Sequence, residues 1–163
     1  MEKAFVTGIL RKILLKFPEE YEIVVSYGYP STDEKPVRHR NVTFYKWLPN
    51  RFEYLKACDL VIARAGHGTI TQCMCYGKPV ILVPTPNHTE QLTNARQAQN
   101  LGVAQIILQK WLTRERLLEK VHRGLQGETG KRLAQIQKES LKHDGLENAA
   151  RTVIAMAGNK QVF

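Results

Sequence analysis

The chain has 163 residues, 43% of them hydrophobic, which suffices for one domain with a full core. No apolar run approaches the roughly 18 residues that a membrane span needs, and no signal-peptide pattern opens the sequence, so we expect a cytoplasmic protein. The net charge of +9 would suit a nucleotide diphosphate or peripheral association with an anionic membrane, whereas nucleic acid is not expected because no RNA-binding motif accompanies the charge.

The first part of the chain predicts alternating helices and strands. Apolar residues recur with helical spacing up to Phe17, and Pro18 ends the run. The polar segment at residues 30–40 contains prolines and is our candidate for a disordered linker. We expect a helix at residues 4–17, strands at 22–26 and 42–45, and, after the loop 47–50, a short helix at 51–57.

Residues 58–95 contain the densest set of signals. Two apolar runs, residues 60–63 and 80–83, have the length of strands that are covered on both faces. Between them lies a loop, residues 64–68, whose two glycines let the backbone turn sharply and approach a ligand. Thr69 is expected to cap a helix from about residue 70 to Gly77. This βαβ unit places the loop at the carboxyl edge of a parallel sheet, where the N–H groups of the helix start would bind phosphate.

The remaining sequence continues the alternation. Cys73 and Cys75 point to different sides of one predicted helix, so no metal site is expected, and the cysteines give no disulfide framework. The pattern indicates an α/β fold with a doubly wound, mostly parallel sheet of about five strands and helices on both faces. A single domain would fill residues 1–163. We expect a helix at 90–100 that stops at Gly102, a strand at 103–108, a helix capped by Thr113, a loop with glycines 124, 127 and 130, and C-terminal helices over 129–163, at 131–142 and 146–157.

The chain resembles a known family over about residues 20–125. The matching positions are Ala65-Gly66-x-Gly68-Thr69-x-x-Gln72, Gly77-Lys78-Pro79, Pro84, Glu90-Gln91 and Asn94-Ala95. This pattern is similar to the C-terminal, donor-binding half of GT-B glycosyltransferases, especially the bacterial lipid-linked GlcNAc transferase of peptidoglycan synthesis and the soluble subunit of the dolichol-linked GlcNAc transferase. That half normally begins with a strand and a glycine-rich loop, which are absent here, as is the acceptor-binding domain. The resemblance therefore implies a fragment of a longer protein or a chain that a partner completes.

The resemblance implies a diphosphate site at Gly66, Gly68 and Thr69, formed by backbone N–H groups and the threonine hydroxyl. The alternative is an ordinary strand-to-helix turn with a threonine cap. His67 would stabilise the leaving group as an imidazolium, and Arg64 could do the same; either residue could equally be part of an ordinary loop.

Two residues are implied to contact the nucleoside. Gln72 occupies the position of a glutamate that grips the ribose in relatives, but Thr69-x-x-Gln72 also fits a capping box. Trp47, in a Trp-x-Pro-Asn sequence similar to the start of the plant glycosyltransferase signature, would lie against the base, or it would pack in the core.

The donor sugar would be bound by Glu90, Gln91 and Asn94 at the start of one helix, unless these residues form a polar turn that faces solvent. His88 could join them or be an exposed loop residue.

The leading hypothesis is the donor-binding domain of an inverting GT-B glycosyltransferase that uses a UDP-sugar such as UDP-GlcNAc without a metal or other cofactor. Its partner would be an acceptor-binding domain or a separate subunit. A UDP-sugar epimerase with the same pocket is the alternative enzyme. A non-catalytic module that binds a nucleotide or docks a partner is favoured by Gln72 and by the missing first loop.

Overall fold

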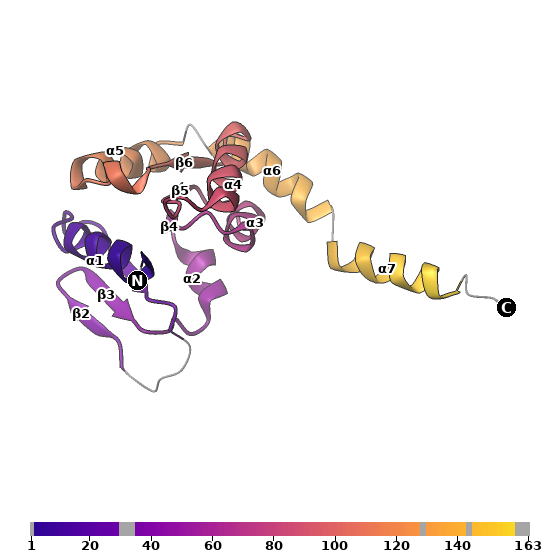
Figure 1. Cartoon of the computed structure of the whole chain (residues 1–163), viewed down its shortest axis with the longest axis horizontal. Helices are drawn as coiled ribbons and strands as arrows, with labels where there is room; N and C mark the ends of the chain where they lie inside the picture. The colour runs from indigo at the N-terminus through magenta and orange to yellow at the C-terminus, as the bar shows by residue number, and fades with distance from the viewer. Residues whose placement is uncertain (1, 30–34, 128–129, 143–144, 159–163) are drawn as a thin grey trace.

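The computed structural model describes residues 2–29, 35–127, 130–142 and 145–158 (Figure 1). These ranges form an α/β structure, as expected. The elements are α1 (Glu2–Leu14), β1 (Ile23–Ser26), β2 (Val37–His39), β3 (Val42–Tyr45), α2 (Arg51–Ala57), β4 (Val61–Ala63), α3 (His67–Cys75), β5 (Val80–Leu82), α4 (Thr89–Asn100), β6 (Ala104–Ile106), the 3-10 helix η1 (Gln109–Trp111), α5 (Arg114–Leu125), α6 (Gly130–Lys142) and α7 (Gly145–Gly158).

The strands form two three-stranded sheets, so the expectation of one sheet with about five strands was wrong. One sheet has the order β1-β3-β2, and the other has the order β4-β5-β6 with all strands parallel. The strand not expected is β2, which lies in the segment that we expected to be a linker and pairs antiparallel with β3. Pairing with β3 stabilises extended backbone there, and a polar local sequence does not reveal such a contact. Residues 30–34 of that segment lie outside the described residues.

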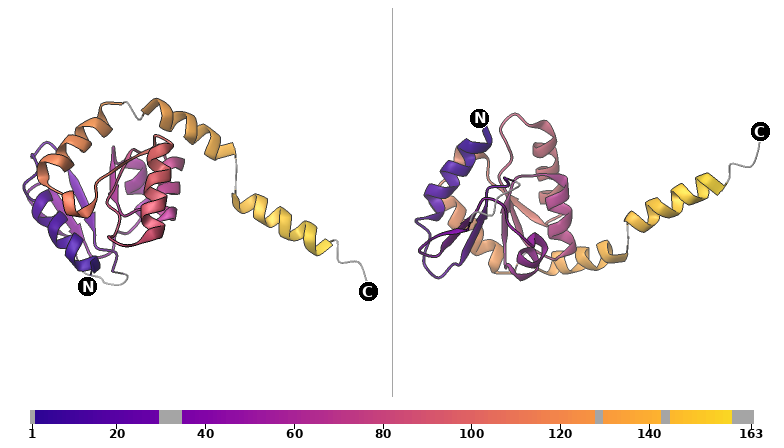
Figure 2. Two further views of the ribbon diagram at one scale, coloured as in Figure 1. Left: turned by 45° about the horizontal axis from the view of Figure 1, so that its top comes forward. Right: turned by 90° about the horizontal axis from the view of Figure 1, so that it is seen from below.

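The second sheet lies between two layers of helices, which confirms the doubly wound arrangement (Figure 2). Its central strand β5 is buried along its whole length. Val80 and Leu82 belong to the core with α3, α4 and α6, whereas Ile81 belongs to the core with α1 and α5. This alternation follows from the two-residue period of a strand.

The two sheets share the core with α1 and α5, but β1 and β4 do not pair with each other. Ile23 and Tyr27 donate their N–H groups to β3 and its flanks, at 2.9 and 3.0 Å, so the N–H and C=O groups of Val24 between them point away from β3. On β4, Val61 and Ala63 bond to β5 and its flanks, at 3.0 and 2.8 Å, so the backbone groups of Ile62 likewise point away. Both strands therefore present one unpaired edge within the described part of the chain.

Glycines determine how two helices end and pack. Gly77 has φ +63° directly after α3, and the bonds Gly77 N–H to Met74 C=O and Lys78 N–H to Cys73 C=O form a Schellman motif, as the glycine predicted. Gly124 was expected in a loop but lies inside α5, buried against Leu60. A Cβ at Gly124 would lie 2.5 Å from Leu60 Cδ1, so this glycine permits close contact between α5 and the residue before β4.

The two C-terminal helices differ in how they contact the domain. Leu133 of α6 is buried in the core with α3, and Gln137 Nε2 donates to the Cys75 carbonyl at 3.1 Å. Helix α7 extends away from the rest of the molecule (Figures 1 and 2) and exposes Val153, Ile154 and other apolar side chains. Among the helices of the described residues, none combines the length and apolar character that crossing a bilayer requires.

Candidate functional site

The glycine loop leads directly from β4 into α3, and the helix begins earlier than expected. Its first residue is His67, and its N-cap is Gly66, whose carbonyl accepts the N–H of Ile70 at 3.2 Å. The prediction that Thr69 caps this helix was therefore wrong, because Thr69 is already its third residue. A polar first turn has no apolar periodicity, so the sequence pattern marked the helix start too late.

The N-terminus of α3 is open. The Gly66 cap has no side-chain hydrogen bond, and the first turn holds no acidic residue. In the ranges that the structure covers, no hydrogen bond engages the N–H groups of His67, Gly68 and Thr69. A Cβ at Gly66 or Gly68 would meet nothing within 4 Å. These free donors and the positive end of the helix dipole suit an anion.

Gly66 and Gly68 leave open space at the start of α3, and neither has the positive φ that favours glycine. Gly66 has φ −74° and ψ 134°, an extended conformation that most residues adopt, so the expected sharp glycine turn was wrong at this position. His67 is exposed, Thr69 is partly exposed, and neither side chain has a polar partner among the described residues.

Arg64 supplies a cation at the same edge of the sheet. Its Nη1 donates to the Thr85 hydroxyl, while its Nη2 is buried without a partner in the described part of the chain. Thr85 itself is 7% exposed and follows β5. Thr85 was not among the predicted site residues; its signal in the sequence is its place between two prolines directly after a buried strand.

Two of the three predicted sugar-binding residues contact the loops of this site. Gln91 Oε1 accepts the Thr85 N–H at 2.9 Å, and Asn94 Nδ2 donates to the carbonyl of Ala65 at 3.3 Å. Each therefore uses one polar atom to hold a loop, and Gln91 Nε2 and Asn94 Oδ1 have no partner within the described ranges. Glu90 is exposed.

His88 is the N-cap of α4 rather than a free loop residue. Its Nδ1 accepts the Gln91 N–H at 3.4 Å, which fixes Nδ1 as the unprotonated nitrogen in this arrangement. The cap stabilises the start of the helix that carries the predicted sugar-binding residues.

Gln72 lies half-buried on α3, five residues after its first residue. The capping-box alternative is wrong, because a capping box requires Thr69 at the N-cap and Gly66 occupies that position. The Gln72 side chain has no polar partner among the residues described. Its contact with ribose stays a prediction.

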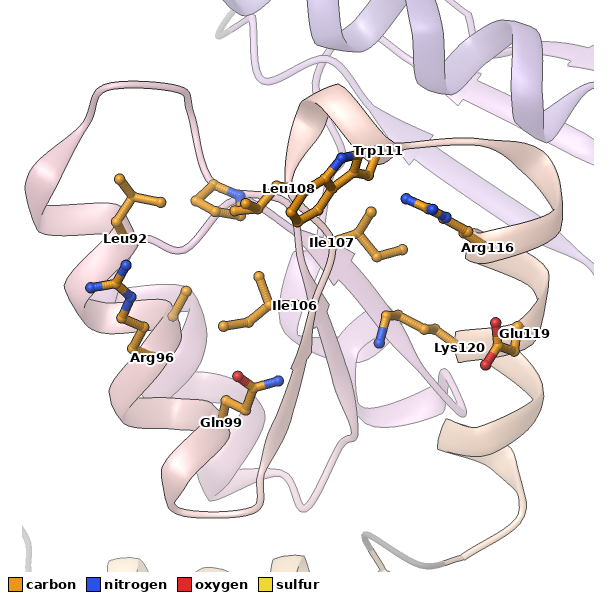
Figure 3. Close-up of a pocket in the computed structure, with 12 residues that line it drawn as sticks. Leu92, Arg96, Gln99, Ile106, Ile107, Leu108, Trp111, Arg116, Glu119 and Lys120 are labelled. Atoms are coloured by element: carbon orange, nitrogen blue, oxygen red, sulfur yellow. The ribbon is translucent and has the colours of Figure 1, made fainter.

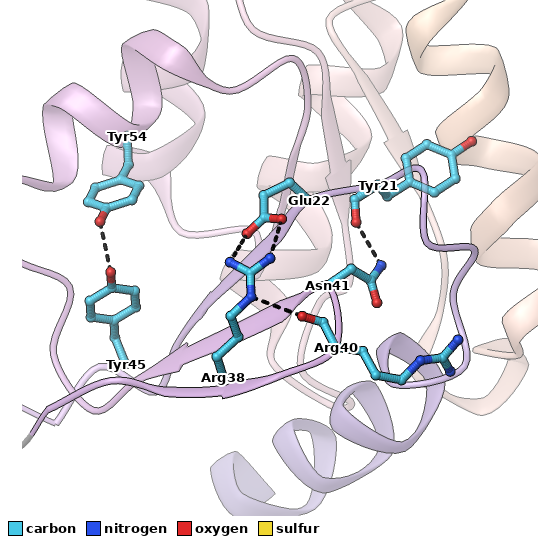
Figure 4. Close-up of polar contacts among 7 residues, drawn as sticks. All are labelled: Tyr21, Glu22, Arg38, Arg40, Asn41, Tyr45 and Tyr54. Carbon is cyan, nitrogen blue, oxygen red and sulfur yellow. Dashed lines mark hydrogen bonds and ion pairs between the residues drawn. The ribbon is translucent and has the colours of Figure 1, made fainter.

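Trp47 lies after β3 and is 44% exposed, so it is not a core residue. The segment around it is anchored by a hydrogen bond of 2.9 Å between the hydroxyl groups of Tyr45 and Tyr54, which joins β3 to α2 (Figure 4). No hydrogen bond of the described residues joins Trp47 to the glycine loop. The tryptophan is available for a ligand, and its role in binding the base stays a prediction.

The glycine loop, Gln91 and Asn94 lie together where β4 and β5 end, whereas no hydrogen bond of the described residues brings Trp47 or Gln72 to them. None of the predicted residues lines the cavity of about 620 Å³ between α4, β6 and α5 (Figure 3). Within the described ranges, no group of three or more His, Cys, Asp or Glu side chains could hold a metal ion. Cys73 is buried in the core, and burial raises the pKa of its thiol to about 12, as expected of a structural cysteine.

The chain matches known proteins over most of its length. The family description "Glycosyltransferase family 28 C-terminal domain" matches residues 4–153. A UDP-N-acetylglucosamine–N-acetylmuramyl-(pentapeptide) pyrophosphoryl-undecaprenol N-acetylglucosamine transferase of Bacillus cytotoxicus is 35% identical over 124 residues, which cover 74% of this chain and 30% of that protein. An uncharacterized glycosyltransferase of Methanosarcina acetivorans is 39% identical over 70 residues, 43% of this chain and 18% of the relative. The chain thus spans less than a third of either relative.

Solved structures agree on the fold. The glycotransferase of kitacinnamycin has a TM-score of 0.74 at 23% identity, over 92% of this chain and 38% of that one. MurG of Acinetobacter baumannii has a TM-score of 0.58 at 19% identity, over 83% of this chain and 41% of that one. The fold is that of the C-terminal, donor-binding half of a GT-B protein, and the chain belongs to the glycosyltransferase family 28 C-terminal domain family.

Proposed function

We propose that the chain binds the donor of an inverting glycosyltransferase that transfers a hexosyl or N-acetylhexosaminyl group from a UDP-sugar. The observation that carries this proposal is the open N-terminus of α3, where three N–H groups have no partner among the described residues, beside the half-buried guanidinium of Arg64. Both features favour a diphosphate. The name of the Bacillus cytotoxicus relative contains UDP-N-acetylglucosamine, which supports a UDP-sugar as donor.

In this proposal an acceptor hydroxyl attacks the anomeric carbon of the donor sugar, and the bond from that carbon to the diphosphate oxygen breaks. The electron pair of that bond leaves with UDP. The helix dipole of α3, the Thr69 hydroxyl and the exposed His67 would stabilise the charge that develops on the departing diphosphate. These groups supply what a metal ion would otherwise provide, so we propose that no metal is required. Attack opposite the leaving group inverts the anomeric centre.

An acceptor-binding domain or a partner subunit would complete the enzyme and supply the general base. Within the described residues the facing edges of β1 and β4 are unpaired, Val24 is 39% exposed and the apolar strand β4 is only half-buried, which supports a further segment that completes the sheet. A further parallel strand that paired with both edges would join the two sheets into one and cover these side chains. The net charge of +9 supports a place at an anionic membrane surface.

Calorimetry with UDP and uridine tests the diphosphate site. UDP should bind more tightly than uridine, and Thr69→Ala and Gly68→Val should each weaken UDP binding. The valine would fill open space above the helix start, so it should obstruct the ligand without disturbing the fold. Thr71→Ala, at an exposed position of the same helix, is the matched control and should leave the affinity unchanged. Equal affinities for uridine and UDP would contradict the proposal.

A further inference from the structure

The cavity between α4, β6 and α5 lies outside the donor site and has a different character (Figure 3). Its volume of about 620 Å³ falls within the range of ligand sites. The helices stand on either side of β6, which is the last strand of its sheet. Apolar side chains from α4, β6 and η1 line the cavity, including Leu92, Ile106 and the half-exposed Trp111, whereas α5 contributes charged side chains.

One edge of β6 is unpaired in the described structure and runs along this cavity. Ile107 donates its N–H to the Leu82 carbonyl at 2.9 Å, so residues 105 and 107 face β5. The N–H and C=O groups of Ala104 and Ile106 therefore point in the opposite direction, toward the open edge. Such an edge is a template for a further strand.

The rim of the cavity is cationic. Arg96 of α4 and Arg116 and Lys120 of α5 line it, and their side chains have no hydrogen-bond or ion-pair partner among the described residues. Glu119 is the single carboxylate in the described lining. Its Oε1 lies 3.6 Å from Nη2 of Arg123, and both side chains are exposed. This carboxylate is therefore paired with Arg123 and does not compensate the three cations of the rim. Two of the cations lie on the α5 side, whereas the Ile106 side chain packs with the core on the α4 side.

We propose that this cavity is a docking site for an extended peptide segment of a partner protein, in which apolar and acidic residues alternate. The segment would add a strand to β6 through Ala104 and Ile106. Because side chains alternate between the two faces of a strand, the apolar residues would face Leu92 and Ile106 on α4 and β6, and the acidic residues would face Arg116 and Lys120 on α5. Backbone bonds give such a site its affinity, and the charges give it its specificity.

Trp111 makes the proposal testable by fluorescence, because the chain has two tryptophans and Trp47→Phe leaves Trp111 as the single reporter. The probe is a capped heptapeptide of alternating glutamate and valine. Its binding should shift the Trp111 emission to shorter wavelength and should saturate. A lysine–valine peptide of the same pattern, and a glutamate–valine peptide with alternate amides N-methylated, should each bind at least roughly tenfold more weakly.

Charge reversal locates the site. The pair Arg116→Glu and Lys120→Glu should weaken binding of the glutamate–valine peptide at least roughly tenfold. The matched pair Lys131→Glu and Lys138→Glu, at exposed positions of α6, changes the net charge equally and should leave binding unchanged. Circular dichroism confirms that each variant is folded.

Four outcomes would overturn the proposal. If the N-methylated peptide bound as tightly as the glutamate–valine peptide, strand pairing would be excluded. If the lysine–valine peptide bound as tightly, recognition by charge would be excluded. Binding of phosphatidylglycerol vesicles that depends on Arg116 and Lys120, without peptide binding, would assign the cavity to lipid. Sedimentation that shows self-association lost in the same variants would assign the cavity to a second copy of the chain.

Discussion

Arg64 provides the sharpest test of how this domain recognises its donor. Its guanidinium is half-buried, with Nη1 bound to the Thr85 hydroxyl and Nη2 buried without a protein partner among the described residues. A diphosphate at the N-terminus of α3 would give this nitrogen the acceptor that it lacks. We predict that Arg64→Met weakens UDP binding and leaves uridine binding unchanged, because uridine carries no phosphate.

The size of the effect follows from hydrogen bonds to charged groups, which contribute about 1.5–3 kcal/mol, so the dissociation constant of UDP should rise roughly 10- to 150-fold. The stability of the free protein should change little. Arg64→Met removes the hydrogen bond to Thr85, which destabilises the folded protein. It also removes the buried Nη2, whose lack of a partner costs about 1–3 kcal/mol, and this stabilises the folded protein. These two contributions have opposite signs and similar size.

Calorimetry with UDP and uridine, together with urea unfolding of the free protein, measures both quantities. Thr85→Val is the control, because it removes the anchor of Arg64 but keeps the charge, and it should weaken UDP binding less than Arg64→Met does. A loss of uridine affinity equal to the loss of UDP affinity would refute this reasoning, since Arg64 would then act on the fold of the whole site. Unchanged UDP affinity would refute the phosphate contact itself.

Three further predictions concern packing, pH and the ribose. Gly124→Ala should lower the unfolding free energy by up to about 2 kcal/mol, because the clash of the new Cβ with Leu60, about 1–3 kcal/mol, exceeds the gain in helix propensity of about 1 kcal/mol. Gly8→Ala in α1, where a Cβ has open space, should raise it by up to about 1 kcal/mol, and urea unfolding checks both. The pKa of Cys73 rises from its usual value of 9.0 to about 12 in the folded state. Between these pH values the unfolded chain has released the thiol proton and the folded chain keeps it, so the unfolding free energy should fall as pH rises through this window. Urea unfolding at about pH 8 and about pH 10.5 should show a smaller fall for Cys73→Ala than for the unsubstituted chain. If Gln72 faces the ribose, Gln72→Glu should tighten UDP binding by about 1 kcal/mol without a change in melting temperature, and unchanged calorimetric affinity would exclude the contact.

The sequence by itself determined the α/β class, most helices and the central βαβ unit. Residues 60–63 and 80–83 have an apolar composition that identifies parallel strands whatever their partners, although only β5 is buried along its length and β4 is half-buried. Gly77 and Thr113 identified a helix end and a helix start, because capping depends on groups within a few residues along the chain. The matched residues around the glycine loop predicted the family, because their types and spacing are visible along the chain without any knowledge of its fold.

Only the tertiary structure decided where polar segments lie and which atoms are already engaged. The strand β2 forms because β3 lies beside it, and α3 begins at His67 because its polar first turn is helical in the folded chain. Likewise, the contact of Arg64 with Thr85 joins residues 21 positions apart, and the open edge of β6 depends on the order of strands in the sheet. These features arise from contacts between distant segments, and a local pattern of residue types carries no information on which distant group a side chain or a strand edge will meet.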